Sequence, residues 1–212
     1  MHAIIIGATG ATGKPLTQLL LNHSDFDKVT AFVRRPLDFS HPKLNVEIID
    51  FDNPDTWQNK VTGDVLFSCL GTTLKQAGSK DAQYKIDYSY QYNFAKIAKQ
   101  NSVKHYVLIS SDMANANSPS FYPRIKGELD NAVIALNFEK FSIFRPPLLV
   151  RENSDRFGER LAEKLILTLN KIGLLKSHTP LPTPLLAQAM IKAVTNNKTG
   201  ILDKHTIWRL LE

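Results

Sequence analysis

Two residues suited to acid–base chemistry stand four positions apart in this chain, Tyr122 and Lys126, in a YxxxK arrangement. On a helix this spacing puts both side chains on one face. A lysine ammonium there favours the phenolate form of the tyrosine, so the phenol becomes a usable proton donor and acceptor. Ser110 and Ser111 come earlier, and either hydroxyl can bind a substrate carbonyl and stabilise an oxyanion. We predict Ser111, Tyr122 and Lys126 as a catalytic set, with Ser111 preferred over Ser110.

The same YxxxK spacing occurs a second time, in Tyr92 and Lys96. Tyr92 falls in the middle of a predicted helix, where an aromatic side chain most often packs against its neighbours. Tyr122 instead follows Ser111 by eleven residues, close to the edge where a sheet of parallel strands binds its ligands. We therefore assign catalysis to Tyr122, with a purely structural role as the alternative.

A glycine-rich turn, GATGATG at residues 7–13, directly follows the apolar run Ala3–Ile6 and opens a helical pattern. In this position glycines let the backbone approach a pyrophosphate, while the helix N-terminus offers unpaired N–H groups and a positive dipole end. A simple strand-to-helix connector is the alternative interpretation. The predicted dinucleotide contacts are Gly7, Thr9, Gly10, Ala11, Thr12 and Gly13.

The end of the second predicted strand indicates which dinucleotide binds. A carboxylate there would accept hydrogen bonds from the adenosine ribose of NAD, but the residues present are Arg34 and Arg35. A guanidinium suits the 2′-phosphate of NADP, so we predict NADP(H), with a solvated basic turn as the alternative. Asp50, after the third strand, is placed either at the adenine edge or in a local turn. The remaining predicted cofactor contacts are Leu70, Gly71 and Thr72 below the riboses and Lys126 on the nicotinamide ribose.

Strand and helix patterns alternate along the chain, which requires a parallel sheet with helices on both faces. The expected class is α/β, a Rossmann-type doubly wound parallel sheet. Residues 1–212 are expected to form one domain, in which about 146–212 contribute a small C-terminal cap on the substrate side. The predicted strands are 3–6, 29–33, 46–49, 65–70, 105–109 and 141–144. The predicted helices follow the glycine turn and then cover 84–100, 127–136, 157–170 and 185–194.

The composition of the 212 residues, 43% hydrophobic and 22% charged, is that of an ordinary globular domain. We expect a cytoplasmic protein without a membrane partner, because neither a leader nor an apolar run of about 20 residues is visible. Cys69 is the only cysteine, which excludes an internal disulfide, and the six histidines lack ligand spacing, so no metal site is predicted. The net charge of +6 is scattered rather than clustered, which argues against nucleic acid and leaves a small molecule as the expected ligand.

Several segments together resemble a known family: GATGATG, the strand end FVRR, SCLGTT followed by KQAG, HYVLISS, YxxxKGE at residues 122–128, and FRPPLL at residues 144–149. They resemble the atypical short-chain dehydrogenase/reductases, an NAD(P)-binding Rossmann family, and within it the Tat-interacting oxidoreductase group with its bacterial relatives. The resemblance runs from residue 3 to about residue 159. It implies NADP(H) and the residue roles given above, and it places Pro146 and Leu148 beside the nicotinamide.

The chain also departs from that pattern. Asp87 stands where many members carry asparagine, Pro147 replaces a glycine, and residues 151–160 resemble the family only loosely. The expected reaction is hydride transfer between NADPH and a small carbonyl or similar electrophile, with Tyr122 as acid. The alternatives are an epimerase or dehydratase that uses the cofactor transiently, and a non-catalytic NADP(H) sensor or protein-binding module.

Overall fold

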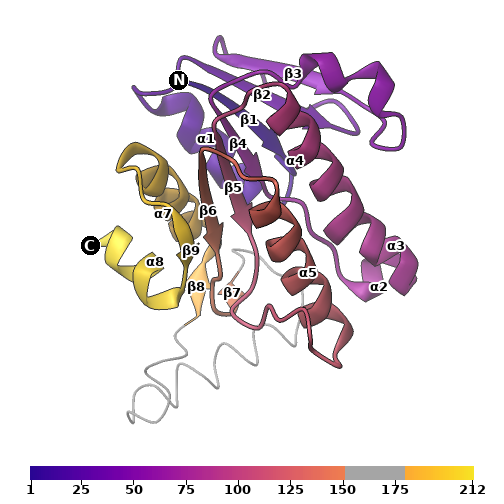
Figure 1. Cartoon of the computed structure of the whole chain (residues 1–212). Helices are drawn as coiled ribbons and strands as arrows, with labels where there is room; N and C mark the ends of the chain where they lie inside the picture. The colour runs from indigo at the N-terminus through magenta and orange to yellow at the C-terminus, as the bar shows by residue number, and fades with distance from the viewer. Residues whose placement is uncertain (151–179) are drawn as a thin grey trace.

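The computed structural model describes residues 1–150 and 180–212, and its centre is a sheet of seven parallel strands (Figure 1). The strand order is β3-β2-β1-β4-β5-β6-β9, so the direction of winding reverses between β1 and β4. The strands are β1 (His2–Ile6), β2 (Lys28–Val33), β3 (Leu44–Ile48), β4 (Val65–Ser68), β5 (His105–Ile109), β6 (Lys140–Phe144) and β9 (Gly200–Leu202). The predicted α/β class with a doubly wound parallel sheet is therefore confirmed.

The central strand β1 is buried on both faces, which explains its unbroken apolar run. Ala3 to Ile6 are fully buried, and Ile6 pairs with Phe32 of β2 on one side and Ser68 of β4 on the other. Because all seven strands are parallel, their carboxyl ends lie along one edge of the sheet. The glycine turn and the segments that follow β2, β4, β5 and β6 therefore converge on that edge.

Helices pack on both faces of the sheet and divide the core into two clusters (Figure 1). One cluster joins the sheet to α1 and α7, and the other joins it to α4 and α5. The helices are α1 (Gly13–Asn22), α2 (Leu74–Ala77), α3 (Lys80–Tyr84), α4 (Tyr90–Gln100), α5 (Phe121–Ala135), α7 (Thr183–Thr195) and α8 (Lys204–Leu211). Two 3₁₀ turns, Pro54–Thr56 and Gln58–Lys60, lie between β3 and β4.

Two helices differ from their predicted bounds in ways that affect the site. The helix predicted over 84–100 begins earlier, as α3, and contains a π-helical turn at Lys85–Ser89 before α4. Helix α5 begins at Phe121 rather than at 127, with Pro123 in its first turn. Proline is tolerated there because the first N–H groups of a helix have no partner within it. Both Tyr122 and Lys126 consequently lie on α5.

Most of the described C-terminal region packs with the main sheet. Strand β9 pairs with β6 at the edge of the main sheet, α7 contacts α1, and α8 contacts α7, so residues 183–211 extend the Rossmann core. Among the residues described after β6, a two-stranded sheet, β7 (Leu149–Val150) with β8 (Leu181–Pro182), and the start of α7 lie near the ligand edge. The predicted helix 157–170 and the basic segment 151–160 lie outside the described residues.

Candidate functional site

The glycine turn crosses the sheet edge at the point where the winding reverses. Gly7 has a φ of +81°, and a Cβ on it would stand 2.5 Å from the carbonyl carbon and oxygen of Cys69. A Cβ on Gly13 would run into the carbonyl of Gly7. The turn is closed by a 2.9 Å hydrogen bond from Gly10 N to Gly7 O, and Lys14 N donates to Gly10 O to start the helix. Gly7 and Gly13 are thus required by close backbone packing.

Helix α1 directs its N-terminus into the same crevice. Ala11 and Thr12, the two residues before its first residue, line a cavity there. No acidic residue occupies its first turn, so its unpaired N–H groups and positive dipole end have no anionic side chain beside them. This arrangement fits an anionic group such as a pyrophosphate.

Three adjoining cavities follow the edge of the sheet. The tyrosine cavity, of about 510 Å³, extends from Gly10 to Tyr122 and Lys126. The arginine cavity, of about 430 Å³, lies beside Gly7, Thr9 and Arg34. A middle cavity of about 360 Å³ shares Gly10, Leu70, Gly71 and Thr72 with the first, and Gly7, Thr9, Arg34 and Leu70 with the second. The three together form a continuous track past the glycine turn, as an extended dinucleotide requires.

Arg34 and Arg35 follow β2 and line the arginine cavity. Both side chains are exposed, and neither makes an ion pair within residues 1–150 and 180–212. The residues lining this cavity include no carboxylate. The described residues that line the arginine cavity therefore carry a net positive charge, which suits a phosphate.

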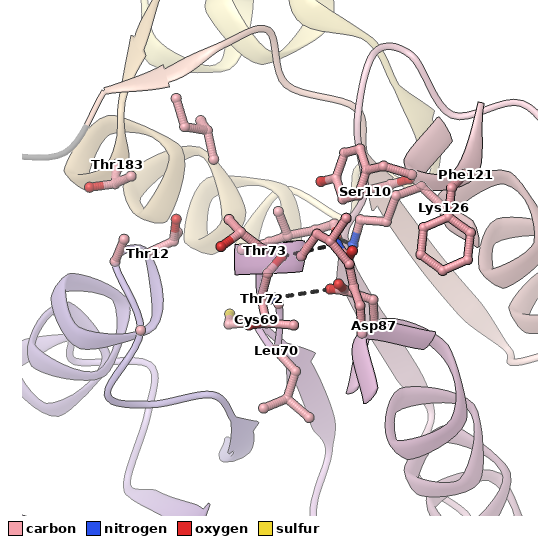
Figure 2. A pocket seen from close by; sticks show the side chains of 18 of the residues that line it. Thr12, Cys69, Leu70, Thr72, Thr73, Asp87, Ser110, Phe121, Lys126 and Thr183 are labelled. Carbon is pink, nitrogen blue, oxygen red and sulfur yellow. Dashed lines mark hydrogen bonds between the residues drawn. The ribbon is translucent and has the colours of Figure 1, made fainter. Parts of the chain in front are cut away.

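Tyr122 and Lys126 form the far wall of the tyrosine cavity. Tyr122 is 36% exposed, whereas Lys126 is 3% exposed and donates a 3.0 Å hydrogen bond from Nζ to the carbonyl of Ile109 at the end of β5. Figure 2 shows Lys126 and Ser110 on one side of this cavity and Thr12 on the other, with Leu70 and Thr72 between them. The predicted tyrosine and lysine thus face the predicted cofactor turn across one cavity.

The structure distinguishes the two adjacent serines. Ser110 lines the tyrosine cavity, and Ser111 is not among its lining residues. Both are buried, and the Oγ of Ser111 accepts a 3.2 Å hydrogen bond from Met113 N. Accepting that bond leaves the hydroxyl proton of Ser111 available to another acceptor. The sequence preference for Ser111 over Ser110 remains a prediction.

Asp87 is a buried carboxylate on the wall of the tyrosine cavity. The π-helical turn carries it, and it is 1% exposed. Its Oδ1 accepts a 3.2 Å hydrogen bond from Thr72 N, while its Oδ2 has no hydrogen-bond partner among the described residues (Figure 2). Burial raises the pKa of Asp87, and the Lys126 ammonium and the Thr72 N–H oppose that rise. Asp87 therefore fixes the turn after β4 and adds a proton-binding group close to Lys126.

The second YxxxK lies outside all three cavities. Tyr92 stacks on Tyr88, with ring centroids 5.8 Å apart, and Lys96 is exposed.

Cys69 lines the tyrosine cavity, but burial raises the pKa of its thiol, so it is a poor nucleophile.

Some predicted contacts are not brought to the cavities. Asp50 is exposed, and its carboxylate accepts from Asp52 N at 3.0 Å, as in the local-turn alternative. Pro146 and Leu148 are not among the lining residues, but the adjacent Leu149 is. Gly13 is buried in the turn and acts through packing.

Sequence reasoning missed several residues that line the tyrosine cavity. They include Leu74, Lys80, Gln83, Phe121, Leu149 and Thr183. Three of them belong to the short helices α2 and α3, which lack an apolar period long enough to be recognised. Their helix starts do carry a sequence signal, because Thr73 and Ser79 are N-caps, and the side-chain oxygen of each accepts a hydrogen bond from the backbone N–H three residues later.

A family described as NAD(P)H-binding matches residues 7–153, which include the glycine turn, both arginines and the YxxxK of α5. The chain belongs to this NAD(P)H-binding family. It is 38% identical to Protein HTATIP2 of Rattus norvegicus over 204 residues, covering 94% of this chain and 83% of that protein. The resemblance to the Tat-interacting oxidoreductase group is therefore confirmed, and a nicotinamide cofactor, NAD or NADP, goes with the family.

Two further comparisons extend this result. Protein FMP52, mitochondrial, of Saccharomyces cerevisiae is 38% identical over 164 residues, covering 74% of this chain and 71% of that protein. The structure of the Bordetella bronchiseptica enzyme WbmH in complex with NAD+ superimposes with a TM-score of 0.73 at 16% identity, covering 95% of this chain and 74% of that one. At this identity the structural likeness supports the Rossmann fold of the NAD(P)H-binding family.

The relatives also correct one expectation. We expected a cytoplasmic protein, but the FMP52 relatives are named mitochondrial, and this conflicts with that expectation. Across the described residues, no helix combines the length and the apolar character that crossing a bilayer demands.

Proposed function

We propose that this member of the NAD(P)H-binding family is an NADP(H)-dependent oxidoreductase that transfers hydride to a small carbonyl or similar electrophile, with Tyr122 as the acid. One observation carries the proposal. Tyr122 and Lys126 face the glycine turn across a single cavity of about 510 Å³, so a proton donor stands opposite the predicted cofactor site. The duplicate Tyr92 and Lys96 have the same spacing but line none of the three cavities described above.

The chain's own groups have distinct tasks in this reaction. When bound, the nicotinamide supplies the hydride that reduces the carbonyl carbon. Tyr122 donates the proton to the carbonyl oxygen, and its 36% exposure lets water return a proton to it. Lys126 uses one N–H on Ile109 O, which fixes its ammonium, and keeps two for the cofactor ribose and for stabilising the phenolate. Ser111 is the proposed donor to the substrate oxygen, because its Oγ accepts from Met113 N and its own hydroxyl proton remains available to donate.

The preference for NADP(H) rests on the arginine cavity. Arg34 and Arg35 are exposed at its wall, and the residues lining it include no carboxylate to accept ribose hydroxyls. A 2′-phosphate would receive charge-assisted hydrogen bonds there, whereas the neutral hydroxyl of NAD would not. The residues beside the glycine turn would hold the pyrophosphate through backbone N–H groups at the start of α1.

The two YxxxK tyrosines provide a test with an internal control. Tyr122→Phe is expected to lower turnover of an accepted carbonyl by about 10² to 10⁴-fold with nearly unchanged NADPH affinity, as for the loss of a general acid. Tyr92→Phe removes the same hydroxyl from a packed position and is expected to leave turnover close to wild type. NADPH absorbance with a panel of small quinones, aldehydes and ketones measures both.

Three results would overturn the proposal. A fully active Tyr122→Phe protein would reject the acid, and equal losses in the two variants would indicate a structural effect. Tight NADPH binding without turnover of any substrate in a broad panel would favour a non-catalytic sensor instead.

A further inference from the structure

One face of the helical run that starts with α3 borders the tyrosine cavity. Lys80, Gln83 and Asp87 all line it, and their spacing of three and then four residues is that of one helix face. The start of the run is fixed locally, because Gly78, at a φ of +84°, separates α2 from α3 and the side chain of Ser79 caps α3. Lys80 therefore has a defined place at the cavity wall, as the first residue of α3.

The charged side chains that line this cavity, within the described residues, are those of Lys80, Asp87 and Lys126. Asp87 and Lys126 are 1% and 3% exposed, and their opposite charges act on each other, since the Lys126 ammonium opposes the rise in the pKa of Asp87. Lys80 is exposed. A molecule that enters the cavity therefore meets one accessible charge, the cation of Lys80.

Phe121 holds that cation beside the proposed acid. The Nζ of Lys80 lies 5.5 Å from the centroid of the Phe121 ring, which also lines the cavity and directly precedes Tyr122 on α5. The negative face of an aromatic ring attracts a cation at this distance. Lys80 makes no ion pair within residues 1–150 and 180–212, so its N–H groups have no carboxylate partner there.

The cavity also offers apolar surface to a ligand. Leu74, Phe121 and Leu149 line it, and all three are exposed or half-buried. Lys80 lines neither the middle nor the arginine cavity, which are the proposed places of the pyrophosphate and the 2′-phosphate. Its charge is therefore available to a second ligand and not to the phosphates of the cofactor.

We propose that Lys80 is a specificity-determining residue and that the substrate is an apolar, aromatic carbonyl compound that carries a carboxylate. The carboxylate accepts hydrogen bonds from the Lys80 ammonium, the apolar body contacts Phe121, and the carbonyl reaches Tyr122. Hydride from NADPH reduces the carbonyl carbon and Tyr122 protonates its oxygen, so the products are the hydroxy acid and NADP+. The inference rests on the proposed function for this reaction and on the cavity alone for binding of the anion.

A pair of aldehydes that differ by one carboxylate tests the assignment. With 4-formylbenzoate, Lys80→Met is expected to raise KM by about 5 to 15-fold with little change in kcat, between the values of an exposed ion pair and of a hydrogen bond to a charged group. With benzaldehyde, KM is expected to stay unchanged, as is the affinity for NADPH. Lys80→Arg is expected to retain a KM close to wild type for 4-formylbenzoate. The matched control is Lys75→Met, which removes an exposed lysine of α2 that lines none of the three cavities.

A binding experiment tests the anion site without turnover. Benzoate and benzamide have similar shapes and differ in charge, and each is titrated into the NADP+-loaded full chain with ligand-observed NMR. The wild type is expected to bind benzoate about 5 to 15-fold more tightly than benzamide, and Lys80→Met is expected to lose this preference. Raised salt is expected to weaken the preference, since the lysine is exposed.

The outcomes separate this inference from the proposed function. Equal binding of benzoate and benzamide to the wild type overturns the inference, as does a Lys80→Met protein with the wild-type KM for 4-formylbenzoate. Reduced NADPH affinity in Lys80→Met also overturns it, because the lysine would then serve the cofactor. A wild type that reduces neither aldehyde but prefers benzoate counts against the proposed function and supports the anion site.

Discussion

The glycines of the turn differ in what surrounds them, so replacing each by alanine is expected to separate folding from cofactor binding. A Cβ on Gly13 would meet the carbonyl carbon and oxygen of Gly7 and, at 3.2 Å, the Cα of Ala8. All three are backbone atoms, so the overlap is relieved only by opening the turn. A Cβ on Gly10 would stand 3.2 Å from Gly7 O and 3.7 Å from Cys69 O, which requires a shift of a few tenths of an ångström.

These contacts set the expected magnitudes. Overpacking in a rigid core costs about 1 to 3 kcal/mol, so Gly13→Ala is expected to lower the free energy of unfolding by about 3 kcal/mol. Gly10→Ala is expected to lower it by about 1 kcal/mol or less, since φ at this position is not in the left-handed region. Urea unfolding followed by far-UV circular dichroism measures both changes.

Substitutions at Gly10, which cost less stability than those at Gly13, are expected to have the larger effect on cofactor binding. Gly10 lines both the tyrosine and the middle cavities, where a larger side chain fills the space that a pyrophosphate would use. Gly10→Val is therefore expected to abolish NADPH binding, measured by cofactor fluorescence, while retaining most of the fold. Equal destabilisation by Gly10→Ala and Gly13→Ala would refute the packing argument. Wild-type NADPH affinity in a folded Gly10→Val protein would refute the placement of the pyrophosphate.

Two further predictions concern charge. Replacing both Arg34 and Arg35 by alanine is expected to reduce NADPH affinity by about 10 to 150-fold, which is the value of a charge-assisted contact. NADH affinity is expected to stay nearly unchanged. Equal NADPH and NADH affinities in the wild type would contradict the NADP assignment. Burial lowers the pKa of His105 from 6.5 to about 4. Between these two pH values the unfolded chain binds a proton on His105 that the folded chain does not, so the free energy of unfolding falls as the pH falls. Between pH 7 and 5 the expected loss is about 2 kcal/mol by urea unfolding, and a His105→Gln variant with the same pH dependence would contradict this cause.

The parts of the fold that the sequence predicts are those with strong local signals. Strand 105–109 has the predicted bounds, and the strand, glycine turn and helix at the start of the chain form as expected. Strand β9 was missed because three residues, Gly200–Leu202, carry no alternation or length to recognise. Its place in the sheet is determined by pairing with β6 and by α7 packing on α1, which are long-range contacts.

The candidate site likewise contains residues that local sequence signals reveal and residues that only long-range contacts reveal. Tyr122 and Lys126 are recognisable from spacing alone, and the spacing continues to Asp130 as a further i+4 step. The sequence gives no sign that Asp130 is buried, because a carboxylate on a helix is most often solvated. The Asp130 carboxylate is paired with Arg145, which the fold brings across from the end of β6. The difference between Ser110 and Ser111 is likewise invisible in sequence, since adjacent residues differ only in which side of the strand end they face.

The two YxxxK motifs show why position along a helix decides chemistry in this architecture. A helix that follows a parallel strand begins at the carboxyl edge, so only its first turns border the ligand crevice. Tyr122 is the second residue of α5 and lines the tyrosine cavity. Tyr92 lies five residues after Asp87, which is the last residue of that helical run to line the tyrosine cavity. Five residues along a helix place Tyr92 about 7.5 Å farther along the axis and rotate it by about 140°. The same spacing therefore places one pair beside the tyrosine cavity at the edge of the sheet and the tyrosine of the other pair in a packing contact farther along its helix.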